Sequence, residues 1–313
     1  MYFSLNLFKP VFPTIYNNNT QLNFLISDVK FEISLYFKTL LNYKMAVSQT
    51  IPQNLKMISE KVLFCYLNTP KATRALKPPR LVAVSKTKPK EMIIEAYRAG
   101  HRDFGENYIQ ELVEKSNDVE LLGCCPDINW HFIGNCQTKN AKKLATCPRL
   151  AVIETITSIK LANKLQTQFS EREKNEEKEI MVEVMVQVNT SGEENKNGIQ
   201  PGPDVISTVK HIVENCPNLK FVGLMTIGAL GNSLVDAENE EDNPDFIKLI
   251  ECRRQITSSL ELEEKSIELS MGMSNDFLDA IRMGSTNIRV GSSIFGARYY
   301  PPETLSGKYK FCD

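Results

Sequence analysis

Short apolar or β-branched runs recur along this chain, and helix-like segments separate them. The runs that we predict as strands lie at 81–84, 102–104, 129–133, 150–153, 180–188, 219–225, 267–270 and 287–290. The helix-like segments between them include 90–99, 107–115, 159–169 and 203–215. Strands that alternate with helices pair in parallel through right-handed crossovers. Eight such units predict an α/β fold that closes into a single (β/α)8 TIM barrel.

An open, doubly wound sheet is the alternative α/β fold for this pattern. Such a sheet usually has a glycine-rich fingerprint after its first strand, whereas the first apolar run here ends in Ser85-Lys86. The pattern therefore favours the barrel. A short helix at 52–66 precedes the first strand, and we expect it to pack outside the barrel.

The chain divides into four predicted parts. These are a poorly ordered extension at 1–44, a helix and linker at 45–80, the barrel at 81–300 and a tail at 301–313. The extension contains three consecutive asparagines at 17–19, and our hypothesis is that the functional chain starts at Met45. Two charged stretches within the barrel, 171–179 and 236–245, are predicted to be solvated loops.

Composition and charge narrow the function classes. Of the 313 residues, 42% are hydrophobic, and the net charge of −1 provides no basic field for nonspecific nucleic-acid binding. No stretch has the composition of a membrane span. The eight cysteines include no C-x-x-C pair, which predicts free thiols in a reducing compartment and a cytoplasmic protein. A mitochondrial address is not supported, because residues 1–44 contain no arginine.

Lys86 is the first candidate for a reactive side chain. It lies at the end of the apolar run of the first predicted strand. Burial at the end of a strand lowers the pKa of an ammonium group and makes the neutral amine available to attack an aldehyde. Pyridoxal 5′-phosphate (PLP) is the commonest biological aldehyde held in this way. The alternative is a surface lysine that begins a solvated turn with Lys88 and Lys90.

Candidate phosphate-binding groups follow the last two predicted strands. Ser274 precedes Asn275-Asp276, and we expect a helix to begin there with Ser or Asn as its cap. Gly291-Ser292 follows the eighth strand, where a glycine allows a second backbone to approach closely. The loops after strands seven and eight are the recurrent phosphate site of TIM barrels. Together with a lysine on strand one, these segments predict a binding site for a phosphorylated aldehyde.

Two polar residues lie within predicted strands. Arg289 could donate to a ring nitrogen at the barrel mouth, which would keep a pyridine ring unprotonated, or it could pair with a carboxylate such as Glu154 or Glu183. His131 lies between two aromatic residues, which favours a hydrogen-bonded core histidine. With three histidines and no acidic partner at metal spacing, we expect neither a zinc site nor a Ser-His-Asp triad.

Seven segments, in order, resemble the pyridoxal phosphate homeostasis protein family, the single-domain relatives of the alanine racemase barrel. They are Ala83–Thr87, Phe104–Asn107, Trp130–Gly134, Gln187–Glu193, Gly223–Thr226, Ser270–Asp276 and Arg289–Gly296. The resemblance implies a fold-type III barrel that holds PLP as a Schiff base on Lys86. It also implies phosphate contacts from Ser274, Gly291 and Ser292. Arg289 would face the pyridine nitrogen, and Asn107 would line the pocket.

A carrier and an amino-acid racemase are the two competing function classes. Racemisation needs acid/base groups on both faces of the substrate, and the second group of related racemases comes from an additional domain. Only about 23 residues follow strand eight, too few for such a domain. We therefore expect a monomeric protein that is not an enzyme and that buffers PLP or delivers it to client enzymes in vitamin B6 homeostasis.

Overall fold

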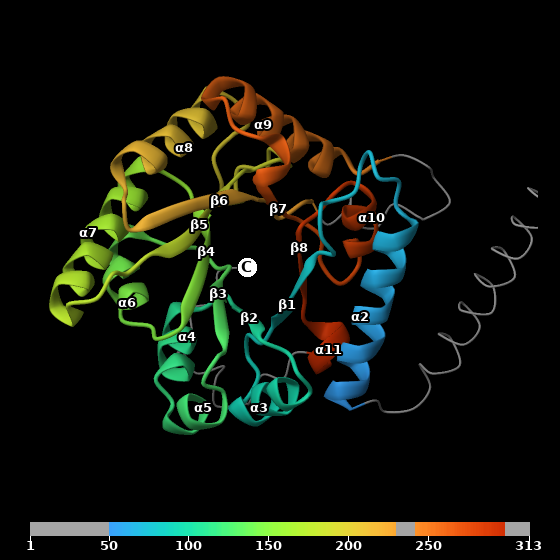
Figure 1. The fold of residues 1–313 in the computed structure, drawn as a ribbon, viewed down its shortest axis with the longest axis vertical. Coiled ribbons are helices and arrows are strands. Elements are labelled where there is room, and N and C mark those ends of the chain that lie inside the picture. Colours follow the sequence, from blue (N-terminus) through green and yellow to red (C-terminus); the bar gives the residue numbers. More distant parts are fainter. Residues whose placement is uncertain (1–49, 230–241, 298–313) are drawn as a thin grey trace, which may run out of the picture. The chain divides into compact units, whose positions relative to one another are not determined.

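The computed structural model describes residues 50–229 and 242–297, and within them eight parallel strands form a closed barrel (Figure 1). The strands are β1 (Arg80–Val84), β2 (Asp103–Glu106), β3 (Asn129–Phe132), β4 (Leu150–Ile156), β5 (Val182–Gln187), β6 (Leu219–Met225), β7 (Glu268–Ser270) and β8 (Asn287–Val290). Each strand pairs with its neighbour in sequence, and β8 closes the barrel on β1 with Leu81 opposite Ile288. The predicted fold class is confirmed, and each of the eight predicted strands overlaps an observed one.

Helices surround the barrel, as the view down its axis shows (Figure 1). The α-helices are α2 (Ile51–Asn68), α3 (Lys90–Arg98), α4 (Ile109–Ser116), α5 (Val119–Cys124), α6 (Ala141–Ala145), α7 (Ile159–Glu176), α8 (Pro203–Asn215), α9 (Pro244–Leu260), α10 (Phe277–Arg282) and α11 (Ser292–Phe295). Two 3-10 turns are η1 (Thr138–Asn140) and η3 (Glu264–Ser266). The order β-α-β-α follows from the alternating pattern of the sequence.

Strand side chains divide between two environments. Val184 and Val186 belong to the large apolar core between the sheet and the helices, whereas Met185 packs in a separate small cluster with Val152 and Met225. Because successive strand residues point to opposite faces, this small cluster lies on the inner face of the barrel. The same alternation identifies the polar strand residues that face the inside of the barrel. Those residues belong to the candidate site described below.

The helix predicted at 52–66 is present as α2 and packs beside α10 and α11 (Figure 1). Its buried positions Leu55, Ile58 and Val62 recur at helical spacing. At its first turn, the Asn54 side chain donates a hydrogen bond to the carbonyl of Ile294 in α11, at 2.9 Å. The expectation that this helix packs outside the barrel is confirmed.

The expectation of a loop at 171–179 is wrong over most of its length, because α7 continues to Glu176. The charged residues occupy the last turns of an amphipathic helix whose apolar positions, Leu165 and Phe169 among them, are buried. Arg172 binds the helix to its neighbour by donating to the carbonyls of Ala145 and Cys147, at 3.1 and 3.3 Å. A charged stretch can therefore be the solvated face of a helix as well as a loop.

Several predictions fall outside the described residues, namely the extension at 1–44 with its proposed start at Met45, the tail at 301–313 and most of the acidic stretch at 236–245. The last part of that stretch, from Pro244, begins α9. Among the helices described, none combines the length and the apolar character needed to cross a bilayer.

Candidate functional site

The ends of β1, β7 and β8 meet at one end of the barrel. A Cβ atom added to Gly291 would lie 3.2 Å from the carbonyl oxygen of Val84, so the start of the β8 loop contacts the end of β1. The Ser292 hydroxyl lies 3.4 Å from the Ser274 hydroxyl, which joins the β7 and β8 loops. Lys86 follows Val84 by two residues. The structure thus brings the lysine and both candidate phosphate loops to the same region.

Lys86 is partly buried in a turn that directly follows β1. The Lys88 amide donates to the Ser85 carbonyl at 3.0 Å and closes this turn. Thr87 has φ of 59°, in the left-handed region that β-branched residues rarely adopt. Such a conformation costs about 1–3 kcal/mol and persists only where surrounding contacts enforce it. Strained backbone of this kind concentrates at functional sites, and here it lies next to the candidate lysine.

Asn107 and Gly134 lie against each other after β2 and β3. A Cβ atom on Gly134 would lie 1.7 Å from the backbone oxygen of Asn107, so only glycine fits. The side-chain oxygen Oδ1 of Asn107 is buried, and it has no hydrogen-bond partner within the part of the chain that the structure describes. A buried acceptor without a partner is costly, and a ligand that donates to it would relieve that cost.

Arg289 faces the barrel interior, since its neighbours Ile288 and Val290 belong to the outer core. Its Nη1 donates to the Ser270 hydroxyl at 2.5 Å, and its Nη2 donates to the Thr226 carbonyl at 2.7 Å. Burial lowers the pKa of Arg289, and the Glu154 carboxylate, 4.0 Å away, acts against this shift. Of the two carboxylates considered from sequence, Glu154 is therefore the partner.

Glu183 is not the partner of the buried arginine. Its carboxylate instead accepts from Lys220 on the neighbouring strand at 3.0 Å, in an ion pair whose lysine is largely exposed.

His131 is a hydrogen-bonded core histidine, as expected. Its Nδ1 lies 2.9 Å from Glu154 and its Nε2 lies 3.4 Å from Asp103. Burial lowers the pKa of His131, but hydrogen bonds and charge from the two carboxylates outweigh burial and raise that pKa overall. Burial likewise raises the pKa of Glu154, but His131, together with the Arg289 charge and the Ser270 hydrogen bond, outweighs burial and lowers that pKa overall. The two groups extend the polar chain that begins at Arg289.

The predicted cap of the helix after Ser274 needs correction. The N-cap residue of α10 is Asp276, not Ser274 or Asn275. The Asp276 carboxylate accepts from the backbone N–H of Met273 at 2.5 Å and so folds the loop back before the helix begins. Ser274 is left to lie beside Ser292, where its hydroxyl is partly exposed.

Similarity to known proteins identifies the family of this chain. A family model for the N-terminal domain of alanine racemase matches residues 67–299. The pyridoxal phosphate homeostasis protein of Mus musculus is 47% identical over 246 residues, which cover 79% of this chain and 86% of that protein. The protein of the same name in Haemophilus influenzae is 38% identical over 250 residues, with coverage of 80% and 97%. The chain belongs to the pyridoxal phosphate homeostasis protein family.

Solved structures agree with this assignment. PipY of Synechococcus elongatus, whose structure has PLP bound, is 29% identical with a TM-score of 0.59, over 76% of this chain and 100% of PipY. An alanine racemase of Clostridium difficile is 13% identical with a TM-score of 0.52, over 77% of this chain and 56% of the racemase. At 13% identity the second likeness shows the fold alone. The more similar relatives are named homeostasis proteins and not racemases, in agreement with the expected absence of enzyme activity.

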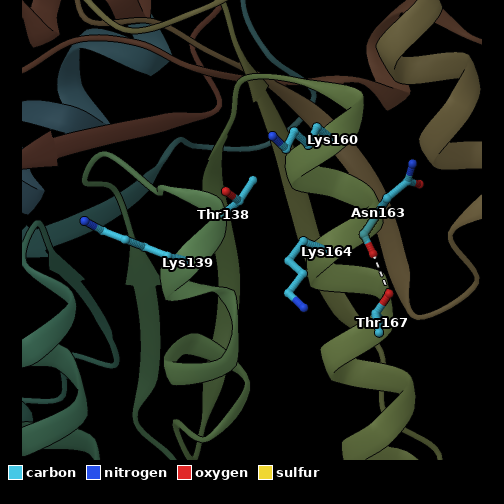
Figure 2. Close-up of a pocket in the computed structure, with 6 residues that line it drawn as sticks. All are labelled: Thr138, Lys139, Lys160, Asn163, Lys164 and Thr167. Carbon is cyan, nitrogen blue, oxygen red and sulfur yellow. Dashed lines mark hydrogen bonds between the residues drawn. The ribbon is translucent and has the colours of Figure 1, made fainter.

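One surface groove of this family member is lined by none of the residues assigned from sequence. Figure 2 shows this groove, of about 420 Å³, between η1 and α7. Its lining consists of Thr138, Lys139, Lys160, Asn163, Lys164 and Thr167. The three lysines are exposed surface residues, and none of the six residues belongs to the candidate PLP site. We therefore assign the groove no role.

Sequence reasoning missed the side chains that support the Lys86 turn in this family member. Glu106, at the end of β2, is fully buried and shares its Oε1 with the Lys115 ammonium, 2.7 Å away, and the Ser85 hydroxyl, 2.6 Å away. The available signal was the i, i+4 spacing of Glu111 and Lys115 on a predicted helix. That spacing is common on solvated faces, so it does not by itself indicate burial.

Proposed function

We propose that this chain binds PLP as a Schiff base on Lys86 and buffers it or delivers it to PLP-dependent client enzymes. The supporting observation is the convergence of the Lys86 turn with the Ser274 and Ser292 loops at one end of the barrel. The family assignment supports the same ligand, because relatives are named pyridoxal phosphate homeostasis proteins and PipY has PLP bound. The free cysteines of the described residues are compatible with the cytoplasmic setting that we propose.

The residues present fit the chemical groups of PLP. The ligand supplies an aldehyde, with which the Lys86 amine condenses as one water is released. The Ser274 and Ser292 hydroxyls are donors for its phosphate, and the Gly291 backbone can approach it closely. Asn107 offers a buried acceptor without a described partner.

The position of Arg289 favours binding of PLP over catalysis with it. Ser270 and Thr226 hold the guanidinium inside the barrel, so in this proposal a cation rather than a carboxylate faces the ring nitrogen. A nearby cation disfavours protonation of that nitrogen. An unprotonated ring is a weaker electron sink, and this favours holding the cofactor over carbanion chemistry.

Reductive trapping tests the site. Purified protein is incubated with one equivalent of PLP, reduced with borohydride and digested, and the modified peptides are mapped by mass spectrometry. We expect one dominant adduct, at Lys86, and a yellow absorbance that disappears on reduction. A dominant adduct at Lys88, only two residues away, would contradict the assignment although the protein still bound PLP.

The phosphate contacts give a separate prediction. The double variant Ser274→Ala with Ser292→Ala is expected to weaken PLP binding about tenfold or more, because hydrogen bonds to charged groups contribute about 1.5–3 kcal/mol each. Pyridoxal, which lacks the phosphate, is the matched control ligand, and its affinity should change less than about twofold by the same reasoning. Titrations followed by absorbance measure both. Equal losses for the two ligands would remove the serines from the phosphate site.

A further inference from the structure

The turn that carries Lys86 is held on its N-terminal side by buried charged groups. The Ser85 hydroxyl donates to Glu106 Oε1 at 2.6 Å, and the Lys115 ammonium donates to the Ser85 carbonyl at 2.8 Å. Ser85 is fully buried, as is Glu106. Both the side chain and the backbone of the residue before Lys86 are thus fixed by β2 and α4.

The C-terminal side of the same turn is held by a second carboxylate. Glu111 Oε1 accepts from the Thr87 backbone N–H at 2.7 Å and from the Lys115 ammonium at 2.7 Å. The left-handed φ of Thr87, 59°, requires contacts of this kind to persist. We call Glu106, Glu111 and Lys115 the clamp, since together they grip the residues on both sides of Lys86.

The clamp is an electrostatic unit with little access to water. The Lys115 side chain is 10% exposed and the Glu106 side chain is 0% exposed. Burial raises the pKa of Glu106 to about 7. Burial lowers the pKa of Lys115, but the two carboxylates outweigh burial and raise it, so the ammonium stays charged. Removal of the ammonium would leave the buried Glu106 and the partly buried Glu111 without their common partner.

The clamp lies on the helix side of the sheet and not in the barrel. Phe104, two residues before Glu106, belongs to the core between sheet and helices, whereas Gly105 between them faces the side chains of Val82 and Val84. Strand alternation therefore points Glu106 away from the barrel interior. Any effect of the clamp on a ligand at the barrel end has to pass through the Lys86 turn.

We propose that the clamp positions the Lys86 amine for attack on the aldehyde, a role that rests on the proposed function. In that step Lys86 loses a proton to solvent, its nitrogen bonds to the aldehyde carbon, and the carbonyl oxygen leaves as water. The clamp residues exchange no atom with the ligand. They hold the strained turn, and so fix the direction from which the amine approaches.

Lys115→Met is the first test, because Met has a similar length and no charge. We expect the rate constant of adduct formation with PLP, followed by absorbance, to fall at least tenfold, and mapped adducts to spread from Lys86 to other lysines. Lys90→Met is the matched control, since Lys90 also lies between two carboxylates, Asp118 and Glu120, at 3.0 Å each, and these partners are outside the clamp. Its rate constant should stay within twofold of wild type.

The comparison of Glu111→Ala with Glu111→Gln keeps the test informative if Lys115→Met does not fold. The Gln variant retains an oxygen that accepts from the Thr87 N–H, whereas the Ala variant removes it. We expect about a fivefold loss of rate for Ala and less than twofold for Gln, in protein that is folded by circular dichroism. A residue that served only stability would lower the unfolding midpoint without changing the rate or the adduct position.

Different outcomes contradict the proposed function and the proposed role of the clamp. A wild-type protein that forms no adduct at Lys86 contradicts the proposed function. A wild-type protein that forms it, together with folded clamp variants that react at the wild-type rate and position, overturns the clamp alone.

Discussion

Gly134→Ala is expected to destabilise this protein by at least about 3 kcal/mol, the upper part of the range for overpacked sites. The added Cβ would lie 1.7 Å from the backbone oxygen of Asn107 and 2.5 Å from its carbonyl carbon. A backbone group cannot rotate away as a side-chain end can, so the β2 and β3 loops must separate. Asn107 belongs to the proposed site, and we therefore expect PLP affinity to fall together with stability. Urea unfolding followed by circular dichroism measures the first effect.

Gly123→Ala is the matched control for this prediction. Gly123 lies in α5, and a Cβ atom added there would meet nothing within 4 Å. Alanine is favoured over glycine inside a helix by about 0.5–1 kcal/mol, so this variant should be as stable as wild type or slightly more stable. If both variants unfolded at the same urea concentration, the close approach of Gly134 to Asn107 would not exist in solution.

Glu154→Gln is expected to cost about 3 kcal/mol of unfolding free energy at pH 5.5, as does the removal of one partner from a buried ion pair. Glu154 accepts from the Ser270 hydroxyl at 2.6 Å and lies between the charges of Arg289 and His131. The variant keeps the shape of the side chain but removes the carboxylate that lies 4.0 Å from the buried guanidinium. Glu183→Gln removes a carboxylate from the exposed pair with Lys220 and should cost less than about 1 kcal/mol.

The effect of Glu154→Gln should depend on pH. The folded-state pKa of His131 is raised above its ordinary value of 6.5, so the stability it contributes is complete below about 6.5 and is lost as the pH rises through the raised value. The folded-state pKa of Glu154 is lowered below 4.5, so its contribution is complete above about 4.5 and is lost as the pH falls through the lowered value.

The difference in stability between wild type and Glu154→Gln is therefore expected to be greatest between about pH 4.5 and 6.5, and to become smaller as the pH rises through the raised pKa of His131. Urea unfolding midpoints at pH 5.5 and pH 9 test this. A difference that did not change between the two pH values would show that the charge of His131 does not change between them in the folded protein.

The barrel was predictable because its signal is local and repeated. Each strand leaves a short apolar run, as at 219–225, where the predicted and observed bounds agree. Helix ends were less predictable. The charged last turns of α7 resemble a loop in sequence. The N-cap of α10 is Asp276, whose carboxylate accepts from Met273 in a loop whose path the sequence does not state.

Short sequence patterns were enough to predict the alternation of strands and helices, the position of Lys86 after the first strand, and the small polar residues after strands seven and eight. These depend on neighbours in the chain, since burial and backbone preference follow from short patterns. Which distant groups become partners depends instead on how the chain folds in three dimensions. Glu154 and Ser270 are 116 residues apart and bond only because the barrel closes, and Ser274 meets Ser292 for the same reason. Side-chain spacing within one element carries no information about such pairs, because the closure of the sheet sets the register between elements.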